Sequence, residues 1–290
     1  MKNKKLSHNG LQGSVTSVMA ALLCILIGLA VGFLVLLAIN PAHAWADGFV
    51  RILKGGFHDA PYGVGKELAN AAPLIMTGLS VGFAFKTGLF NIGAAGQYTL
   101  GAYGALYCAI MLKLPWFVCL LAAAILGGLW GAIPGFFKAY FNINEVITSI
   151  MFNWIGLYLV NELVYQNGTG PMYDVRNTRT LNLGKNADLA QSVIPDFGLN
   201  KLFQTNSTTI AIFLAAVVAI LIWVVLNKTT FGYELKAVGL NKSAARYAGI
   251  NEKKNIILSM AIAGALAGFG AGLFYLSNVG QWNPLNSTSL

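Results

Sequence analysis

Residues 227–255 read NKTTFGYELKAVGLNKSAARYAGINEKKN and form a polar stretch between two apolar segments, each long enough to cross a bilayer. Six Lys and Arg residues lie in this stretch, and its acidic residues are Glu234 and Glu252. Loops rich in Lys and Arg favour the cytoplasmic side of a membrane. We therefore predict a cytoplasmic loop, called the 227–255 loop below, that offers a surface to a cytosolic partner.

Part of the 227–255 loop has the composition of a short helix. The segment Asn241–Ala248 is compatible with a helix and is bracketed by Gly239 and Gly249. Its alanines would form a face of small side chains that another protein can approach closely: Ala244, Ala245 and Ala248. A simpler interpretation is a basic loop that only sets the topology or touches anionic lipid. We favour docking of the short helix against a partner.

The composition is that of a polytopic membrane protein. The chain has 290 residues, of which 56% are hydrophobic and only 10% charged, with 33 glycines. The formal net charge of +9 does not indicate a nucleic-acid partner, because the basic residues lie in short loops between apolar segments. We predict a single transmembrane domain over residues 1–290, surrounded by membrane lipid.

Seven apolar segments predict an all-α fold with a cytoplasmic N-terminus. Their approximate bounds are 18–39, 68–85, a segment that follows 87–98 and ends near 112, 116–137, 144–165, 208–226 and 256–276. In this topology, eleven Lys and Arg residues lie inside, against the two acidic residues of the 227–255 loop. Residues 166–206 form the longest outer loop, which we expect to fold into a small cap.

The first apolar segment, 18–39, follows Lys2, Lys4 and Lys5. The small-residue triplets within 42–46 could be a signal-peptidase site. However, the segment is longer than the apolar region of a signal peptide. We therefore predict that it is retained as the first membrane-spanning helix.

Residues 87–98, TGLFNIGAAGQY, are too rich in glycine and amides for an ordinary lipid-facing helix. The backbone here must be covered by protein or line a cavity. We predict a broken or re-entrant segment before the third span. Its polar residues Asn91 and Gln97 are candidates for the substrate pathway, because an amide can match a polar solute without the cost of a buried charge.

Glycines recur four residues apart in several predicted spans, and we expect each set to form a face where another helix packs closely. The sets are Gly28/Gly32, Gly78/Gly82, Gly127/Gly131/Gly135 and Gly264/Gly268/Gly272. Sliding surfaces between two states of a transporter are the less favoured interpretation.

The fifth apolar segment carries a polar stripe, because Glu145, Ser149 and Asn153 recur every four residues. Such groups face protein or water rather than lipid. One interpretation ties Glu145 to a neighbouring helix end and places Asn153 in a hydrogen bond between helices. The other gives the stripe a role in the translocation pathway.

Three segments resemble permease subunits of bacterial ABC importers, in the nucleoside and simple-sugar branch related to the ribose and branched-chain amino acid permeases. They are GYELKAVGLN with AARYAGI (232–241 and 244–250), LFNIGAAGQ (89–97) and NEVITSIMFN (144–153). The resemblance runs from about residue 73 to 272. It implies that the 227–255 loop carries a coupling helix for a separate ATPase, with contacts from Gly239, Asn241, Ala244, Ala245, Arg246, Tyr247 and Gly249.

The resemblance also implies the partners and the cellular location. They are an ATP-binding subunit that holds ATP and Mg²⁺, a second permease subunit, identical or related, and an extracellular substrate-binding lipoprotein. The location is the bacterial plasma membrane, and the transported solute is a nucleoside or a related simple sugar. Family members usually continue with further hydrophobic segments, whereas this sequence ends in a polar stretch at Leu290. We therefore expect that C-terminal helices of the full family fold are missing here.

Two other classes of protein are less consistent with the sequence. A stand-alone secondary transporter or channel would need ion or proton sites in the membrane, but the few carboxylates lie near the ends of the spans. An intramembrane enzyme would need a nucleophile with its base, or a metal cluster, yet no His lies in a predicted span and no metal-ligand spacing is present. We expect neither catalysis nor a cofactor in this chain, since it also lacks a phosphate-binding P-loop motif.

Overall fold

A computed structural model describes residues 3–284, and describes side chains from residue 18 onward. The N-terminal Lys2 and the polar end at Leu290, on which two of the predictions rest, lie outside the described residues. The chain divides into two compact units, residues 1–63 and 64–290. Each unit is described separately below.

The first unit contains one long helix, α1 (Asn3–Ile39), followed by a π-helical segment (Ala44–Phe49) and the short helix α2 (Val50–Lys54). Residues 18–39 of α1 are apolar and long enough to cross a membrane, as predicted. Phe33 packs against Trp45 and Phe49, with ring centroids 5.6 and 4.9 Å apart. The triplets that resemble a cleavage site lie across the turn after α1 and the start of the π-helical segment, and retention of this helix stays a prediction.

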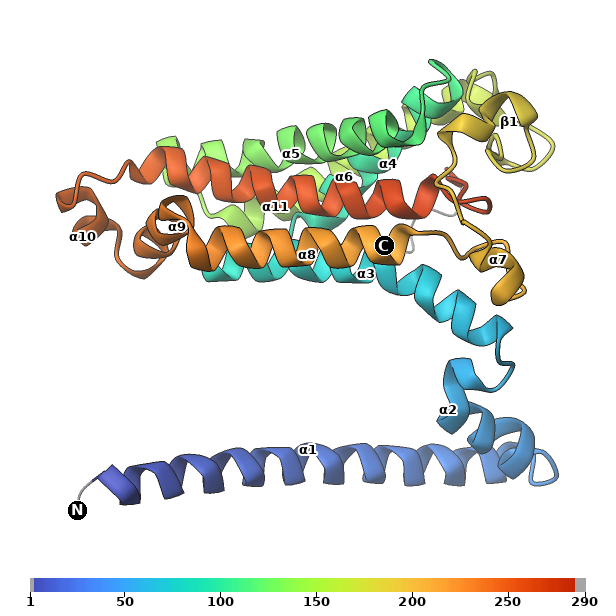
Figure 1. Ribbon diagram of the computed structural model, residues 1–290, viewed down its shortest axis with the longest axis horizontal. Helices are drawn as coiled ribbons and strands as arrows, with labels where there is room; N and C mark the ends of the chain where they lie inside the picture. Colours follow the sequence, from blue (N-terminus) through green and yellow to red (C-terminus); the bar gives the residue numbers. More distant parts are fainter. Residues whose placement is uncertain (1–2, 285–290) are drawn as a thin grey trace. The chain divides into compact units, whose positions relative to one another are not determined.

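The second unit is a bundle of long helices. They are α3 (Tyr62–Lys86, which starts at the unit boundary), α4 (Ala94–Ile110), α5 (Trp116–Phe141), α6 (Glu145–Tyr165), α8 (Ala211–Lys228) and α11 (Glu252–Tyr275) (Figure 1). Within residues 3–284, six helices are long and apolar enough to cross a membrane: α1, α3, α5, α6, α8 and α11. The predicted all-α, polytopic fold is confirmed. The count of seven spans is not confirmed, since α4 has only 17 residues.

Glycines bring α5 and α11 into backbone contact at the centre of the second unit. A Cβ atom on Gly127 would lie 2.5 Å from the carbonyl oxygen of Gly264, and one on Gly131 would lie 2.5 Å from that of Met260. No side chain fits in such a gap, so the predicted packing faces on these two helices are confirmed. The faces at Gly28/Gly32 and Gly78/Gly82 meet no atom within 4 Å in the part of the chain that the structure describes.

The outer loop is folded, as expected, and holds two short strands, β1 (Tyr173–Asp174) and β2 (Arg179–Thr180), a 3-10 helix (Ala187–Ser192) and α7 (Leu199–Leu202). The strands pair in an antiparallel register with Tyr173 opposite Thr180. Asn177 donates a hydrogen bond of 2.7 Å to the Asp174 carboxylate, and this bond lowers the pKa of Asp174 below its ordinary value. Residues 166–206 are called the cap below.

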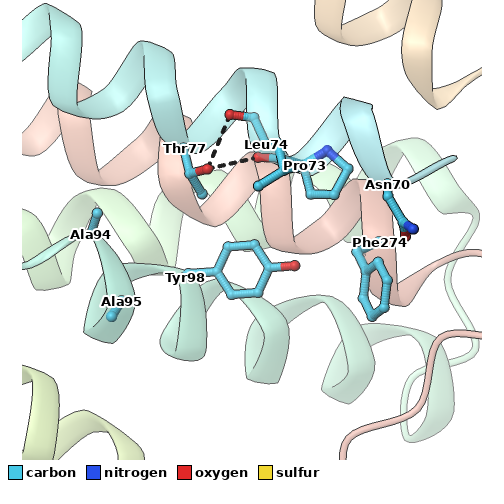
Figure 2. Close-up of a pocket in the computed structure, with 8 residues that line it drawn as sticks. All are labelled: Asn70, Pro73, Leu74, Thr77, Ala94, Ala95, Tyr98 and Phe274. Atoms are coloured by element: carbon cyan, nitrogen blue, oxygen red, sulfur yellow. Dashed lines mark hydrogen bonds between the residues drawn. The ribbon is translucent and has the colours of Figure 1, made fainter. Parts of the chain in front are cut away.

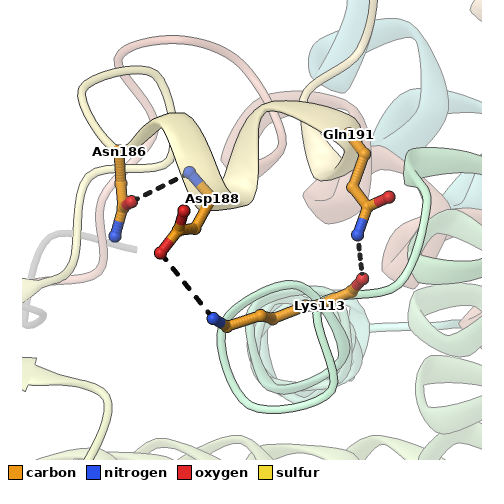
Figure 3. A network of polar contacts seen from close by, with 4 residues as sticks. All are labelled: Lys113, Asn186, Asp188 and Gln191. Carbon is orange, nitrogen blue, oxygen red and sulfur yellow. Dashed lines mark hydrogen bonds and ion pairs between the residues drawn. The ribbon is translucent and has the colours of Figure 1, made fainter.

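The cap is fastened to the turn between α4 and α5 (Figure 3). The ammonium of Lys113 lies 3.9 Å from the carboxylate of Asp188, and Gln191 donates a hydrogen bond to the Lys113 carbonyl. Ser192 donates a further bond of 2.6 Å to the carbonyl of Leu114. Because the last two bonds are made to backbone carbonyls, they hold the cap against the helical bundle whatever the charge state of the surface.

The 227–255 loop contains two helices, α9 (Thr230–Leu240) and α10 (Lys242–Tyr247). Side-chain caps explain where the helices of this region begin. Thr229 accepts from the backbone of Gly232, Asn241 from Ala244 and Asn251 from Lys254, at 3.0 to 3.1 Å. Gly249 then turns the chain with a φ of +81°, a value that favours glycine. The predicted short helix is present, and α9 is an addition that was not predicted.

Candidate functional site: a coupling surface and a buried polar network

The helix break predicted before the third span is present. Helix α3 ends at Lys86 and α4 begins at Ala94, and Gly88 between them has a φ of +73°. The segment 87–93 is called the break below. Thr87, Leu89 and Asn91 in it are at most 4% exposed. The break is thus partly covered by protein, with these three residues buried while Gly88 and Phe90 stay exposed.

Asn91 and Gln97 form a reciprocal amide pair in the bundle interior. Asn91 donates to the Gln97 side-chain oxygen at 2.8 Å, and Gln97 donates back at 2.9 Å. Asn91 also donates to Ser80 at 3.1 Å, and Ser80 donates to the carbonyl of Ala263 at 2.6 Å. The pair thus joins α3, the break, α4 and α11. Both residues are 1% exposed. Such a satisfied network fixes how the helices pack.

Asn153 on α6 satisfies one backbone group in the break and one at the start of α4. Its side-chain oxygen accepts from the Gly96 N–H at 2.8 Å, and its nitrogen donates to the Ile92 carbonyl at 3.0 Å. These are the hydrogen bonds between elements that one interpretation of the polar stripe predicted. The first N–H groups of a helix have no carbonyl partner within the helix. The Asn153 oxygen supplies an acceptor for one of them.

The other two residues of the polar stripe have different surroundings. Glu145 forms an ion pair of 2.8 Å with Lys138 across the short turn between α5 and α6. Ser149 is fully buried, and its hydroxyl oxygen has no hydrogen-bond partner among the residues that the structure describes. It lies beside Gly93, where a Cβ atom would be 3.2 Å from that oxygen.

The 227–255 loop exposes large apolar side chains although it is polar overall. Tyr247 is 96% exposed, Leu240 88% and Tyr233 69%. The opposite side of α9 is packed, with Leu235 and Val238 buried. Exposed aromatic and aliphatic residues on an otherwise polar loop are typical of a surface that binds another protein. This set is called the coupling surface below.

The expectation that Ala245 belongs to the exposed small-residue face is wrong. Ala245 is 3% exposed and packs in this chain's own core, whereas Ala244 and Ala248 are exposed. The reason is local geometry, because positions 244, 247 and 248 share one face of the helical turn and position 245 points away from it. Arg246 is also engaged, since its guanidinium contacts the carboxylate of Glu252.

Gly239 has a contact that the sequence does not indicate. A Cβ atom at this position would lie 2.5 Å from the carbonyl carbon of Thr87 and 2.7 Å from the nitrogen of Gly88. The backbone of α9 therefore touches the backbone of the break directly. Thr87 in turn hydrogen-bonds the hydroxyl of Ser259 on α11. Helix α9 thus contacts the same break that carries Asn91 of the buried amide pair.

A largely apolar cavity of about 550 Å³ lies between α3, α4 and α11 (Figure 2). Its lining consists of Asn70, Pro73, Leu74, Thr77, Ala94, Ala95, Tyr98 and Phe274. Thr77 turns its hydroxyl back to the carbonyls of Pro73 and Leu74, at 3.0 and 3.1 Å, so the cavity wall is mainly apolar. None of the pathway residues predicted from sequence lines it. The signal that could have found it is Tyr98, a large aromatic residue within the glycine-rich start of α4.

Among the described residues, no cluster of His, Cys, Asp and Glu side chains could hold a metal ion. The polar groups of the interior are amides and hydroxyls, which bind solutes through hydrogen bonds.

Comparison with known families assigns the chain. Residues 65–289 match the family described as the permease component of the branched-chain amino acid transport system. The chain belongs to this permease family. It is therefore a transport subunit and a multi-pass protein of the plasma membrane. No solved structure shows detectable similarity to it.

Individual permeases of the family are similar over most of the chain. The guanosine ABC transporter permease NupP of Bacillus subtilis is 34% identical over 280 residues, which cover 93% of this chain and 72% of the relative. The nucleoside ABC transporter permease NupB of Lactococcus lactis is 32% identical over 90% of this chain and 72% of its own length. The glucose ABC transporter permease TsgB13 of Haloferax volcanii is 35% identical over 86% of this chain and 65% of its own length.

Proposed function

We propose that this permease imports a nucleoside, or a related simple sugar, in a complex powered by a separate ATPase. The coupling surface is the observation that carries the proposal. A chain that worked alone would have no use for Tyr247 and Leu240 standing almost fully exposed on a basic loop, since exposed aromatic and aliphatic groups are costly unless a partner covers them.

The ATPase would contact α10 and the outer side of α9. Ala244, Tyr247 and Ala248 lie on one face, which allows a groove of the partner to approach the helix backbone closely. Asn241 begins α10 by capping it, and Gly249 ends it. These two residues then set the length and direction of the docking helix, while Arg246 and Glu252 brace it against the start of α11.

Nucleosides are the favoured substrate because the permeases named for guanosine and nucleosides are similar over 93% and 90% of this chain, against 86% for the permease named for glucose. The interior offers amides, hydroxyls and one aromatic cavity, and it has no charged side chain in the described lining of that cavity. A neutral nucleobase can stack on an aromatic ring such as Tyr98, and a ribose can exchange hydrogen bonds with amides. In this proposal, Asn91, Gln97 and Asn153 shape the pathway through packing, with Ser149 and Glu145 beside it.

The complex would contain this chain, a second permease subunit, two ATP-binding subunits that hold ATP and Mg²⁺, and an extracellular substrate-binding lipoprotein. The test is uptake of radiolabelled guanosine and glucose into vesicles that contain the reconstituted complex, with and without ATP. ATP-dependent guanosine uptake supports the proposal. Guanosine uptake by this chain alone, without an ATPase, would instead identify a stand-alone transporter.

A further inference from the structure

A second cavity lies between the cap and the segment after α11, and it shares no lining residue with the cavity of Figure 2. Its volume is about 560 Å³. The floor consists of four half-buried amide side chains, Asn182, Asn200, Asn278 and Gln281. The exposed rim carries Arg179, Lys185 and Asn206. No Asp or Glu occurs among the described residues that line it.

The walls of this cavity are held in place by hydrogen bonds between the cap and the segment after α11. Thr180 and Trp282 exchange two bonds, of 2.9 and 3.0 Å, and Gln281 donates to the Thr180 carbonyl at 2.7 Å. The side-chain oxygen of Asn182 accepts from the Lys185 N–H at 3.0 Å. Asn182 and Gln281 are preorganised by these bonds, so a ligand would not have to order these two amides on binding.

One polar atom of a residue that lines the cavity lacks a partner. The side-chain oxygen of Asn200 is buried and makes no hydrogen bond among the residues that the structure describes. A buried acceptor without a partner is unfavourable, and folded proteins rarely keep one without a reason. Because water does not reach this oxygen in the structure, a ligand in the cavity would pair with it once the Asn200 side chain turns toward the cavity.

We propose that the cap cavity binds a polyhydroxylated small molecule of the nucleoside or sugar class, as an outer binding site on the route into the membrane. Amides both donate and accept, as do sugar hydroxyls, so a floor of four amides matches a ribose or a hexose. The planar guanidinium of Arg179 at the rim can stack on a nucleobase. The volume lies within the usual range for small-molecule sites. The inference rests on the proposed function and adds a site to it.

The test is direct binding of guanosine and of glucose to the purified full chain in nanodiscs, by calorimetry, without ATPase or binding protein. Asn200→Ala removes the unpartnered acceptor, and Asn206→Ala removes an exposed rim amide whose loss does not disturb the core. Each variant should weaken binding about tenfold, the equivalent of one hydrogen bond. Asn177→Ala, on the exposed β1–β2 turn and outside the cavity, is the matched control and should bind as the unmodified chain does.

In the reconstituted complex, the Asn200 and Asn206 variants should raise the substrate concentration for half-maximal uptake, with the maximal rate unchanged. Unchanged binding in both variants, or no binding of either probe to the unmodified chain, overturns the inference. The inference is also overturned if Arg179→Ala and Lys185→Ala weaken capture of the binding protein but leave guanosine and glucose binding unchanged. The rim would then bind an acidic surface of that protein. Import by the unmodified complex is measured in parallel, and its absence would refute the proposed function separately.

Discussion

Replacing Gly239 with Ala tests whether the contact between α9 and the break carries movement from the ATPase. The added Cβ would lie 2.5 Å from the carbonyl carbon of Thr87, and ordinary contacts begin at 3.4 Å. The two backbones must therefore separate by about 1 Å, as the difference between these distances shows. Overpacking of this size costs about 1–3 kcal/mol. Ala also favours a helix over Gly by up to about 1 kcal/mol, so any loss arises from the contact and not from α9 itself.

A coupling free energy of about 1–3 kcal/mol corresponds to a change of roughly 5- to 150-fold. We expect substrate-stimulated ATPase activity and uptake to decrease by a factor in that range, measured in vesicles that contain the complex. The ATPase subunit should still co-purify, because the exposed side chains of α10 are unchanged. Gly82→Ala on α3 is the matched control, since a Cβ there meets no described atom within 4 Å. The reasoning would be refuted if the Gly239 variant showed the same ATPase stimulation and uptake as the unmodified complex. It would also be refuted if the variant complex no longer assembled.

Three further predictions concern other parts of the chain. Tyr247→Ala, at a side chain that is 96% exposed, should leave the fold intact but weaken capture of the ATPase subunit by about 1–3 kcal/mol, and undiminished capture would remove this residue from the coupling surface. Asn91→Leu leaves the Gln97 amide without its partner and should lower stability by about 1–3 kcal/mol, measured as a lower melting temperature in detergent; an unchanged temperature would show that the pair is not structural. Single cysteines at Lys242 and Asn186 should react with a membrane-impermeant reagent from opposite sides of the membrane, and labelling from one side would overturn the topology.

The correction at position 245 changes how the coupling surface should be probed. A bulky residue at Ala245 would disrupt the chain's own packing, because this side chain is 3% exposed. The result could not separate loss of the fold from loss of ATPase docking. Substitution of Ala244 or Ala248 addresses the exposed face directly.

Local chemistry in the sequence was enough to predict the fold class and the presence of a short helix in the 227–255 loop. Apolar segments of membrane-spanning length and the Lys and Arg bias are properties of contiguous residues. The caps at Thr229, Asn241 and Asn251 act within three residues of their own position. The break before α4 was also predictable, because its glycines and amides are incompatible with a lipid-facing helix.

Only the tertiary structure decided which surfaces meet. The four glycine sets look alike in sequence, yet those of α5 and α11 pack together while Gly78/Gly82 meets no described atom within 4 Å. Whether Ser80 bonds the Ala263 carbonyl, and whether Gly239 touches a partner or its own chain, depends on residues far apart in sequence. The side of α10 that is buried follows from how α9 and α11 hold it. Helical periodicity tells which residues share a face, but the burial of that face is set by long-range packing.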